Sequence, residues 1–263
     1  MSRTGKEKNK LKNNLVDRSS SSSFCYPAIN FPYLPRKNDV FAYKVDELIP
    51  GVLVCDDVFS RDECQMLVQC CKDFLEATNK NNAPPKKGEA FRNNERYLHS
   101  NQGENKEFAD KLWKERLSPI FLSDRNKHLF EMQELSSLNP SAQPKTTEDT
   151  PCFLPVGVNT DLKFYRYKEG AQFGQHVDEP VFKVVDGEKL VSEFTILIYI
   201  SCDTSLKGGE TKFWLKKHPI SVEPKCGRVC LHWTGKECLH SGEKVDRGEK
   251  YVLRTDLFYK QTL

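Results

Sequence analysis

The chain has 263 residues, of which 38% are hydrophobic and 11% aromatic, enough for the core of one large domain or two small ones. Its 40 basic and 37 acidic residues leave a net charge of +3, which excludes the basic excess of a dedicated nucleic-acid-binding protein. No apolar run approaches the roughly 18 residues that cross a bilayer, and none follows the Lys-rich N-terminus. We therefore expect neither a membrane span nor a signal peptide.

The ten cysteines are irregularly spaced, and two of them, Cys70 and Cys71, are adjacent. In a chain of this size without a secretion signal, that pattern favours free buried thiols over a disulfide framework. We therefore expect a protein of a reducing compartment, the cytosol or the nucleus.

Residues 1–40 contain a basic run, a serine run and a proline-rich stretch. Such segments cannot bury enough apolar area to offset the loss of chain entropy, so we predict a disordered tail. Residues 41–150 are expected to form a helical support region that begins with a short strand at Leu53–Cys55.

Two helices are predicted in this support region. Ser60-Arg-Asp-Glu63 is a capping box, and an apolar stripe follows it at Leu67, Cys70, Cys71, Phe74 and Leu75. A second helix is predicted over 105–117, with Phe108, Leu112 and Trp113 facing inward. Polar loops are expected at 78–90 and, as a long insertion, at 134–151.

Residues 151–263 are expected to form a β core. They contain short β-branched or aromatic runs separated by Gly, Pro or charged turns, at Leu162–Tyr167, Phe194–Ile200, Thr211–Trp214, Ile220–Val222, Arg228–Leu231 and Tyr251–Phe258. Many short strands with turns between them indicate a sandwich, a jelly roll or a barrel. The predicted fold class is therefore mainly β with N-terminal helices.

Three side chains in this β core have the residue types of a metal site. His176 and Asp178 are two positions apart, so in an extended strand they share a face, and His240 can reach them from another strand. Two histidines and one carboxylate on one face of an ion are typical of non-haem Fe(II) oxygenases. The chain has six histidines, and we interpret His99, His128 and His218 as ordinary surface or core residues.

A second cluster leaves a structural zinc site open as an alternative. Its members are Cys226, Cys230, His232, Cys238 and His240, which alternate so that pairs share a strand face. The cluster contains no Cys-x₂-Cys pair, and its spacing does not match a zinc ribbon or finger.

Several motifs occur in one order between Asn159 and Phe258. They are Tyr167-x-x-Gly170-x-x-Phe173-x-x-His176-x-Asp178, Thr195-x-x-x-Tyr199, Gly208-Gly209-Glu210-Thr211-x-Phe213, Pro224-x-x-Gly227, and His240 followed by Val245-x-x-Gly248-x-Lys250-Tyr251-x-x-Arg254-x-Asp256. This segment resembles the prolyl 4-hydroxylase-type branch of the Fe(II)/2-oxoglutarate-dependent oxygenases.

The resemblance implies a double-stranded β-helix, which is a distorted jelly roll, in which His176, Asp178 and His240 bind Fe(II). It also implies that Arg254 pairs with the distal carboxylate of 2-oxoglutarate, because guanidinium suits a carboxylate. Tyr167, Thr195 and Tyr199 would supply hydroxyls to the co-substrate or its wall. Phe173 stands where these prolyl hydroxylases commonly have Tyr. O₂ is the further co-substrate, and ascorbate is included as an accessory.

The implied reaction is hydroxylation of a C–H bond with release of succinate and CO₂. Halogenating relatives lack the carboxylate, and this chain keeps Asp178. A protein or peptide substrate of prolyl type is expected, with Arg92, Asn94, Arg96 and Phe173 as candidate contacts. The alternatives are a nucleic-acid demethylase, whose usual second Arg is replaced here by Lys260, and a non-catalytic jelly-roll module with a structural metal. The sequence does not define the oligomeric state.

Overall fold

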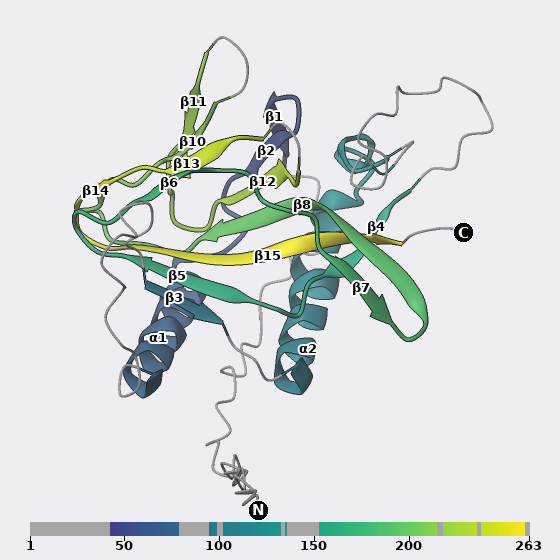
Figure 1. Ribbon diagram of the computed structural model, residues 1–263, viewed down its shortest axis with the longest axis horizontal. Coiled ribbons are helices and arrows are strands. Elements are labelled where there is room, and N and C mark those ends of the chain that lie inside the picture. Colours follow the sequence, from purple (N-terminus) through teal and green to yellow (C-terminus); the bar gives the residue numbers. More distant parts are fainter. Residues whose placement is uncertain are drawn as a thin grey trace, which may run out of the picture.

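The computed structural model describes residues 43–78, 95–98, 102–132, 135, 153–214, 218–235 and 238–260 (Figure 1). The predicted tail, the loop at 78–90 beyond its first residue and the insertion at 134–151, apart from Leu135, lie outside these residues. So do the side chains of Phe74 and Leu75, although both belong to the first helix.

The first helix, α1, spans Arg61–Thr78, and it begins where the capping box predicted. The Ser60 hydroxyl accepts a hydrogen bond from the Glu63 backbone N–H at 3.2 Å, and the Glu63 carboxylate accepts one from the Ser60 backbone N–H at 2.7 Å. Both contacts satisfy backbone donors that the start of a helix leaves unpaired. Leu67, Cys70 and Cys71 are buried, as the apolar stripe predicted.

The second predicted helix starts earlier and changes its winding. Helix α2 spans Gln102–Lys111, a π-helical stretch continues over Leu112–Leu117, and α3 covers Ser118–Phe121, followed by a 3₁₀ turn at Lys127–Leu129. Phe108, Leu112 and Trp113 are buried, as predicted. Among the described residues, no helix has the length and hydropathy that would let it span a membrane.

A buried ion pair joins α1 to the π-helical stretch. The Arg116 guanidinium binds the Glu63 carboxylate and donates a second hydrogen bond to the Val58 carbonyl at 3.0 Å. Both side chains are almost fully buried. Removing one partner of such a pair leaves an uncompensated buried charge, which is strongly destabilising.

We expect Arg116→Met to lower the free energy of unfolding by about 3–5 kcal/mol, because the Glu63 carboxylate would stay buried without its cation. Urea denaturation followed by circular dichroism measures this change. The double variant Glu63→Gln/Arg116→Met, which removes both charges, should recover part of the loss. Equal stability of the single variant and the wild type would contradict the prediction.

The strands form two facing sheets and a short ribbon. The nine-stranded major sheet has the order β1-β2-β12-β8-β15-β5-β3, with β4 paired to β15 and β7 to β8. Its strands are β1 (Asp46–Ile49), β2 (Val52–Cys55), β3 (Glu95–Leu98), β4 (Pro155–Val158), β5 (Lys163–Tyr167), β7 (Phe182–Val185), β8 (Glu188–Tyr199), β12 (Val229–Trp233) and β15 (Lys250–Lys260).

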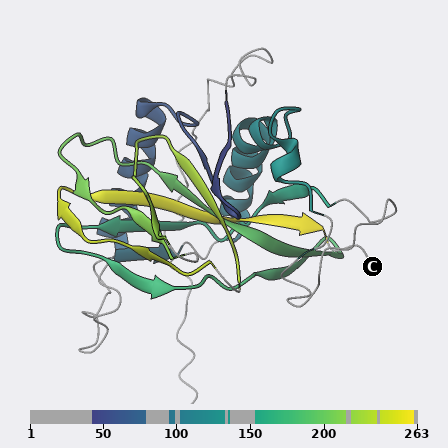
Figure 2. The ribbon, with the colours of Figure 1, turned by 90° about the horizontal axis from the view of Figure 1, so that it is seen from above.

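The four-stranded minor sheet has the order β11-β10-β13-β6, and β14 pairs with β9 in the ribbon. These strands are β6 (Phe173–His176), β9 (Lys207–Gly208), β10 (Thr211–Phe213), β11 (Ile220–Val222), β13 (His240–Gly242) and β14 (Val245–Arg247). Figure 2 shows the long strand β15 crossing the molecule. The fold is a double-stranded β-helix with N-terminal helices, as the resemblance implied.

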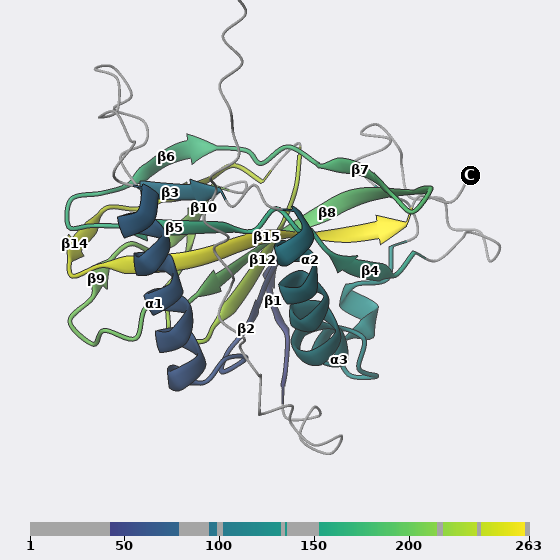
Figure 3. The same ribbon diagram turned by 90° about the horizontal axis from the view of Figure 1, so that it is seen from below.

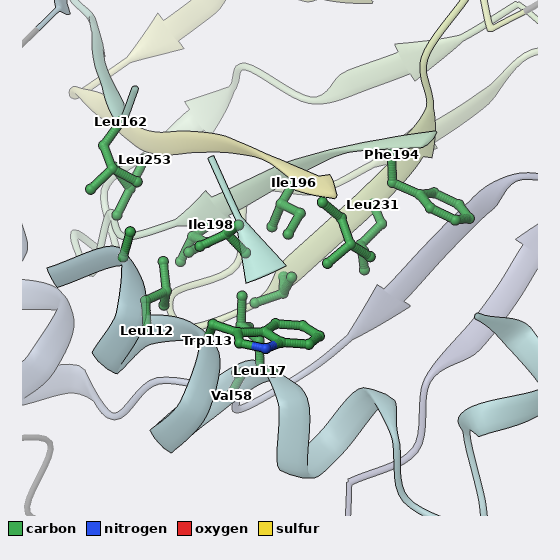
Figure 4. Close-up of a cluster of buried hydrophobic side chains, with 14 of the residues drawn as sticks. Val58, Leu112, Trp113, Leu117, Leu162, Phe194, Ile196, Ile198, Leu231 and Leu253 are labelled. Carbon is green, nitrogen blue, oxygen red and sulfur yellow. The ribbon is translucent and has the colours of Figure 1, made fainter. Parts of the chain in front are cut away.

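The helices cover the outer face of the major sheet (Figure 3). Ile196 and Ile198 of β8, Leu231 of β12 and Leu253 of β15 belong to the large hydrophobic cluster that also holds the helix residues Leu112, Trp113 and Leu117 (Figure 4). Side chains alternate along a strand, so the intervening residues of the same strands face the space between the two sheets. That inner face carries the polar residues described below.

The prediction that the cysteines are free is wrong for one pair. Cys202 and Cys226 form a disulfide with their Cα atoms 4.9 Å apart. Cys55, Cys64, Cys70, Cys71, Cys230 and Cys238 are free and buried, as predicted. The fold brings together the end of β8 and the turn before β12, which lie 24 residues apart in the chain. The free thiols were the basis for expecting a reducing compartment, and this disulfide removes part of that basis.

Candidate active site

Two strands of the minor sheet bring the predicted metal ligands together. His176 ends β6 and His240 begins β13, and the two are direct partners in the antiparallel ladder. Asp178 follows two residues after His176, and its carboxylate oxygens lie 3.8 Å from the Nε2 atom of each of these two histidines. One donor atom from each of the three residues lies within 4.8 Å of the others. These three side chains could hold a metal ion.

The hydrogen bonds of the two rings suit metal binding. The Nδ1 atom of His176 lies 2.8 Å from the Gly174 carbonyl, and that of His240 lies 2.9 Å from the Cys238 carbonyl. Because a carbonyl only accepts, each Nδ1 carries the proton in a neutral ring and Nε2 keeps its lone pair. Burial lowers the pKa of His240, which favours the neutral, ligating form.

Asp178 is held by a cation and a hydroxyl. The Thr195 hydroxyl donates to its Oδ2 at 2.9 Å, and a guanidinium nitrogen of Arg254 lies 3.1 Å from the same oxygen. Burial acts to raise the pKa of Asp178, but Arg254 and the neighbouring histidines outweigh it and hold the pKa below its usual value. The carboxylate is therefore ionised at neutral pH, as a metal ligand must be.

A cavity of about 40 Å³ opens beside these ligands. Its wall is made largely by alternate residues of paired strands, because side chains two positions apart share a face. Lys250, Val252 and Arg254 of β15 line it opposite Tyr167, Tyr165 and Leu197. The remaining lining residues are Phe173, His176, Asp178, Thr211, His240 and Gly242.

Lys250 is the cation that the sequence interpretation did not assign. Its side chain is 2% exposed, and its Nζ lies 4.8 Å from the centre of the Tyr167 ring and 5.5 Å from that of Tyr199. No carboxylate lies within ion-pair distance of this ammonium among the described residues. Burial lowers the pKa of Lys250 to about 8, although Glu210 and Glu243 act to raise it. A buried ammonium of this kind favours an anion in the adjacent cavity.

The residues predicted to contact the co-substrate separate into two groups. Tyr167, Phe173 and Arg254 line the cavity. Thr195 is fully buried and bonds to Asp178, while the Tyr199 hydroxyl donates to Thr211 at 2.7 Å. Neither of these two lines the cavity, so their expected place on its wall is corrected: Thr195 contacts Asp178 and Tyr199 contacts Thr211.

The candidate substrate contacts before β4 cannot be placed. Arg92 and Asn94 lie outside the described residues, and Arg96 lies in β3 with a side chain outside them. Phe173, the fourth candidate, stacks on the His176 ring with their centroids 3.7 Å apart. His128 and His218 are exposed, as predicted, while His99 lies outside the described residues.

The structure does not support the zinc cluster that the sequence left open as an alternative. Cys226 is bonded to Cys202 and cannot serve as a thiolate ligand. His232 lies instead beside the metal ligands, with its ring centroid 4.2 Å from that of His240. Burial raises the pKa of the Cys230 thiol to about 12 and that of Cys238 likewise to about 12, so neither is a thiolate at neutral pH without a metal.

A facial set of two imidazoles and one carboxylate inside a double-stranded β-helix defines a class of oxidising metalloenzyme. Residues 162–255 match the model of the 2OG-Fe(II) oxygenase superfamily. These residues form a 2OG-Fe(II) oxygenase domain, the catalytic domain of 2-oxoglutarate-dependent dioxygenases. Enzymes of this superfamily use Fe(II), 2-oxoglutarate and O₂.

Solved structures with some similarity to the chain include three prolyl hydroxylases. A viral collagen prolyl hydroxylase from Paramecium Bursaria Chlorella virus-1, in complex with 2OG, has 21% identity, a TM-score of 0.46, and coverage of 80% of this chain and 96% of its own. A Pseudomonas putida prolyl-4-hydroxylase has 14% identity, a TM-score of 0.48, and coverage of 84% and 95%.

The third is a Trichoplax adhaerens prolyl hydroxylase in complex with a hypoxia inducible factor oxygen degradation domain peptide fragment. It has 13% identity, a TM-score of 0.44, and coverage of 84% of this chain and 86% of its own. No curated protein sequence matches the chain significantly.

Proposed function

We propose that the protein hydroxylates a C–H bond of a peptidyl substrate, of prolyl type, and converts 2-oxoglutarate to succinate and CO₂. The observation that carries this proposal is one cavity lined by the three candidate metal ligands and by a buried cation, Lys250. The order of motifs between Tyr167 and Asp256, which resembles that of prolyl 4-hydroxylases, supports the substrate class.

His176, Asp178 and His240 would hold Fe(II). Their donor set fits, because two neutral imidazoles and an ionised carboxylate occupy three positions and leave the others for exogenous ligands. The ion, when bound, supplies the redox chemistry that couples decarboxylation of 2-oxoglutarate to hydroxylation. The backbone carbonyls of Gly174 and Cys238 orient the two imidazoles.

Lys250 is the better candidate for the distal carboxylate of 2-oxoglutarate. It lines the cavity and has no carboxylate partner within ion-pair distance among the described residues, whereas Arg254 already contacts two, Asp178 at 3.1 Å and Asp256 at 3.4 Å. We therefore assign co-substrate binding to Lys250, against the sequence-based expectation for Arg254. Arg254 and Thr195 instead hold the Asp178 carboxylate in place. Tyr167 lines the cavity beside Lys250, whose Nζ lies 4.8 Å from its ring centre.

Two charged residues of the cavity wall are partly open to solvent. Arg254 and Asp178 are exposed by 14% and 12% at their side chains, so both reach the opening of the cavity.

The strand that follows the metal ligands offers a surface for a peptide. Phe182 and Val184 of β7 are 57% and 70% exposed, and Val177, between His176 and Asp178, is 37% exposed. Phe182 and Val184 share one strand face. Exposed apolar side chains are typical of a binding surface, and these follow the metal ligands within a few residues of the chain.

We expect Phe182→Ala to raise KM for the peptide substrate about fivefold or more, which corresponds to loss of roughly 1 kcal/mol of contact energy. The affinity for 2-oxoglutarate should stay unchanged, because Phe182 does not line the cavity. Steady-state kinetics measures both. Val156→Ala, which truncates another exposed apolar residue on β4, is the matched control and should behave like the wild type.

The nucleic-acid alternative receives little support. Lys260 stands where the demethylases have their second Arg. It lies at the far end of β15 from Lys250, and its ammonium pairs with Glu188.

The proposal is tested by incubating the protein with Fe(II), 2-oxoglutarate, O₂ and ascorbate, and with proline-containing peptides or methylated oligonucleotides. A mass increase of 16 Da on a peptide is expected. Demethylation of an oligonucleotide without any change to the peptides would overturn the substrate class.

A further inference from the structure

Three imidazoles, and not two, converge on the Asp178 carboxylate. The Nε2 atom of His232 lies 3.5 Å from Oδ2 of Asp178, closer than the 3.8 Å of His176 and His240. His232 lies on β12, and like Cys230 two residues before it, it points between the two sheets. It therefore reaches the carboxylate from the major sheet, while the other two histidines come from the minor sheet.

The imidazole rings of His176 and His232 pack against the His240 ring in the same way. The His240 ring lies between the other two, with its centroid 4.2 Å from that of His176 and 4.2 Å from that of His232, at an interplanar angle of 51° in both cases. The Nδ1 atom of His232 lies 3.1 Å from the Trp233 carbonyl. A carbonyl only accepts, so the neutral His232 ring carries its proton on Nδ1 and presents the Nε2 lone pair to Asp178, as His176 and His240 do.

This lone pair has no partner. The His232 side chain is completely buried, and its Nε2 makes no hydrogen bond within the described part of the chain. A buried polar atom without a partner is costly, and a lone pair that faces a carboxylate oxygen adds repulsion. A cation between Nε2 and Oδ2 removes both costs. Two ligand atoms that each lie roughly 2.0–2.2 Å from an ion are roughly 3.0–3.5 Å apart. The Nε2 atom of His232 and Oδ2 of Asp178 are 3.5 Å apart.

We propose that His232 is a fourth protein ligand of the metal ion in the resting protein, before 2-oxoglutarate binds. The inference rests on the proposed metal site at His176, Asp178 and His240. Four protein donors leave two positions on a six-coordinate ion, the number that 2-oxoglutarate takes up. Once 2-oxoglutarate occupies both positions, His232 would have to leave the ion to free a position for O₂.

The first test counts imidazoles on the metal directly. Co(II) is added anaerobically to the full chain without 2-oxoglutarate, and the histidine ligands are counted by X-ray absorption spectroscopy. Three imidazoles are expected. Two imidazoles would overturn the proposal and leave the proposed function intact, whereas failure to bind Co(II) would count against both.

The second test uses His232→Phe, which keeps a ring of similar shape next to Phe213, whose centroid lies 5.4 Å away. The Co(II) Kd should rise at least about tenfold, the lower limit for loss of a group that supports a metal site, and the visible Co(II) spectrum should change. His218→Phe, at an exposed histidine, is the control. A His232→Phe protein with the Kd and spectrum of the control would overturn the proposal, and His232→Asn replaces it if the Phe variant does not fold.

Discussion

Replacing Lys250 by Met is expected to weaken 2-oxoglutarate binding about 30-fold or more. Loss of one partner of a buried charge pair costs roughly 2–5 kcal/mol, and Lys250 is the buried cation without a carboxylate partner in the cavity wall. The affinity for Co(II) should remain close to that of the wild type, because Lys250 is not one of the candidate metal ligands. Calorimetric titration of the anaerobic Co(II) protein with 2-oxoglutarate separates the two effects.

The pH dependence of the same binding provides a second measurement. The pKa of Lys250 is lowered by burial to about 8, so the ammonium loses its proton as the pH rises through that value. The affinity of the wild type for 2-oxoglutarate should therefore fall above pH 8, by about tenfold per pH unit. Lys250→Arg keeps its charge at high pH, and any binding that it retains should not fall over this range.

The variant Arg254→Ala shows whether Arg254 or Lys250 binds the distal carboxylate of 2-oxoglutarate. If Arg254→Ala abolished 2-oxoglutarate binding while Lys250→Met bound it normally, the assignment derived from the sequence would be correct and the one derived from the geometry wrong. We expect the opposite, because Arg254 is engaged by Asp178 and Asp256.

Replacing His240 by Ala is expected to abolish succinate formation. The variant removes a ligand that is 4% exposed and held by the Cys238 carbonyl, so no water-exposed substitute can easily take its place. The Kd for Fe(II) or Co(II) should rise more than about 100-fold, beyond the effect of losing a group that only supports a ligand. Anaerobic metal titration and a succinate assay measure the two consequences.

The control for this variant is His128→Ala, which removes an exposed histidine far along the chain from the site. It should bind metal and produce succinate like the wild type. Circular dichroism establishes whether His240→Ala is folded. A folded His240→Ala protein with wild-type metal affinity would sink both the metal assignment and the enzymatic proposal.

The sequence predicted much of the architecture, because the relevant signals are local. The Ser60–Glu63 capping box set the start of α1, and β-branched or aromatic runs bounded by turns marked β8 and β15 as strands. The hairpin of β7 with β8 was missed, because the exposed Phe182 and Val184 of β7 do not alternate with buried residues.

The site was harder to predict, because the local sequence pattern does not show whether a polar side chain will be buried. His176 and Asp178 could be recognised by their spacing, but Lys250 follows Gly248 and Glu249 and resembles a surface turn residue. Its burial results from the pairing of β15 with β5, which places it opposite Tyr167. The same reason explains His232, whose neighbours His240 and Asp178 come from other strands, and the disulfide of Cys202 and Cys226.

The two faces of strand β15 can change separately in evolution. Lys250, Val252 and Arg254 line the cavity, while Leu253 and Leu257 on the opposite face pack under the helices. Substitutions at one set can alter co-substrate preference and substitutions at the other can tune stability, with little interference between them. A single-residue deletion between Lys250 and Arg254 would exchange the two faces beyond it. This strand should therefore tolerate many substitutions but very few changes in length.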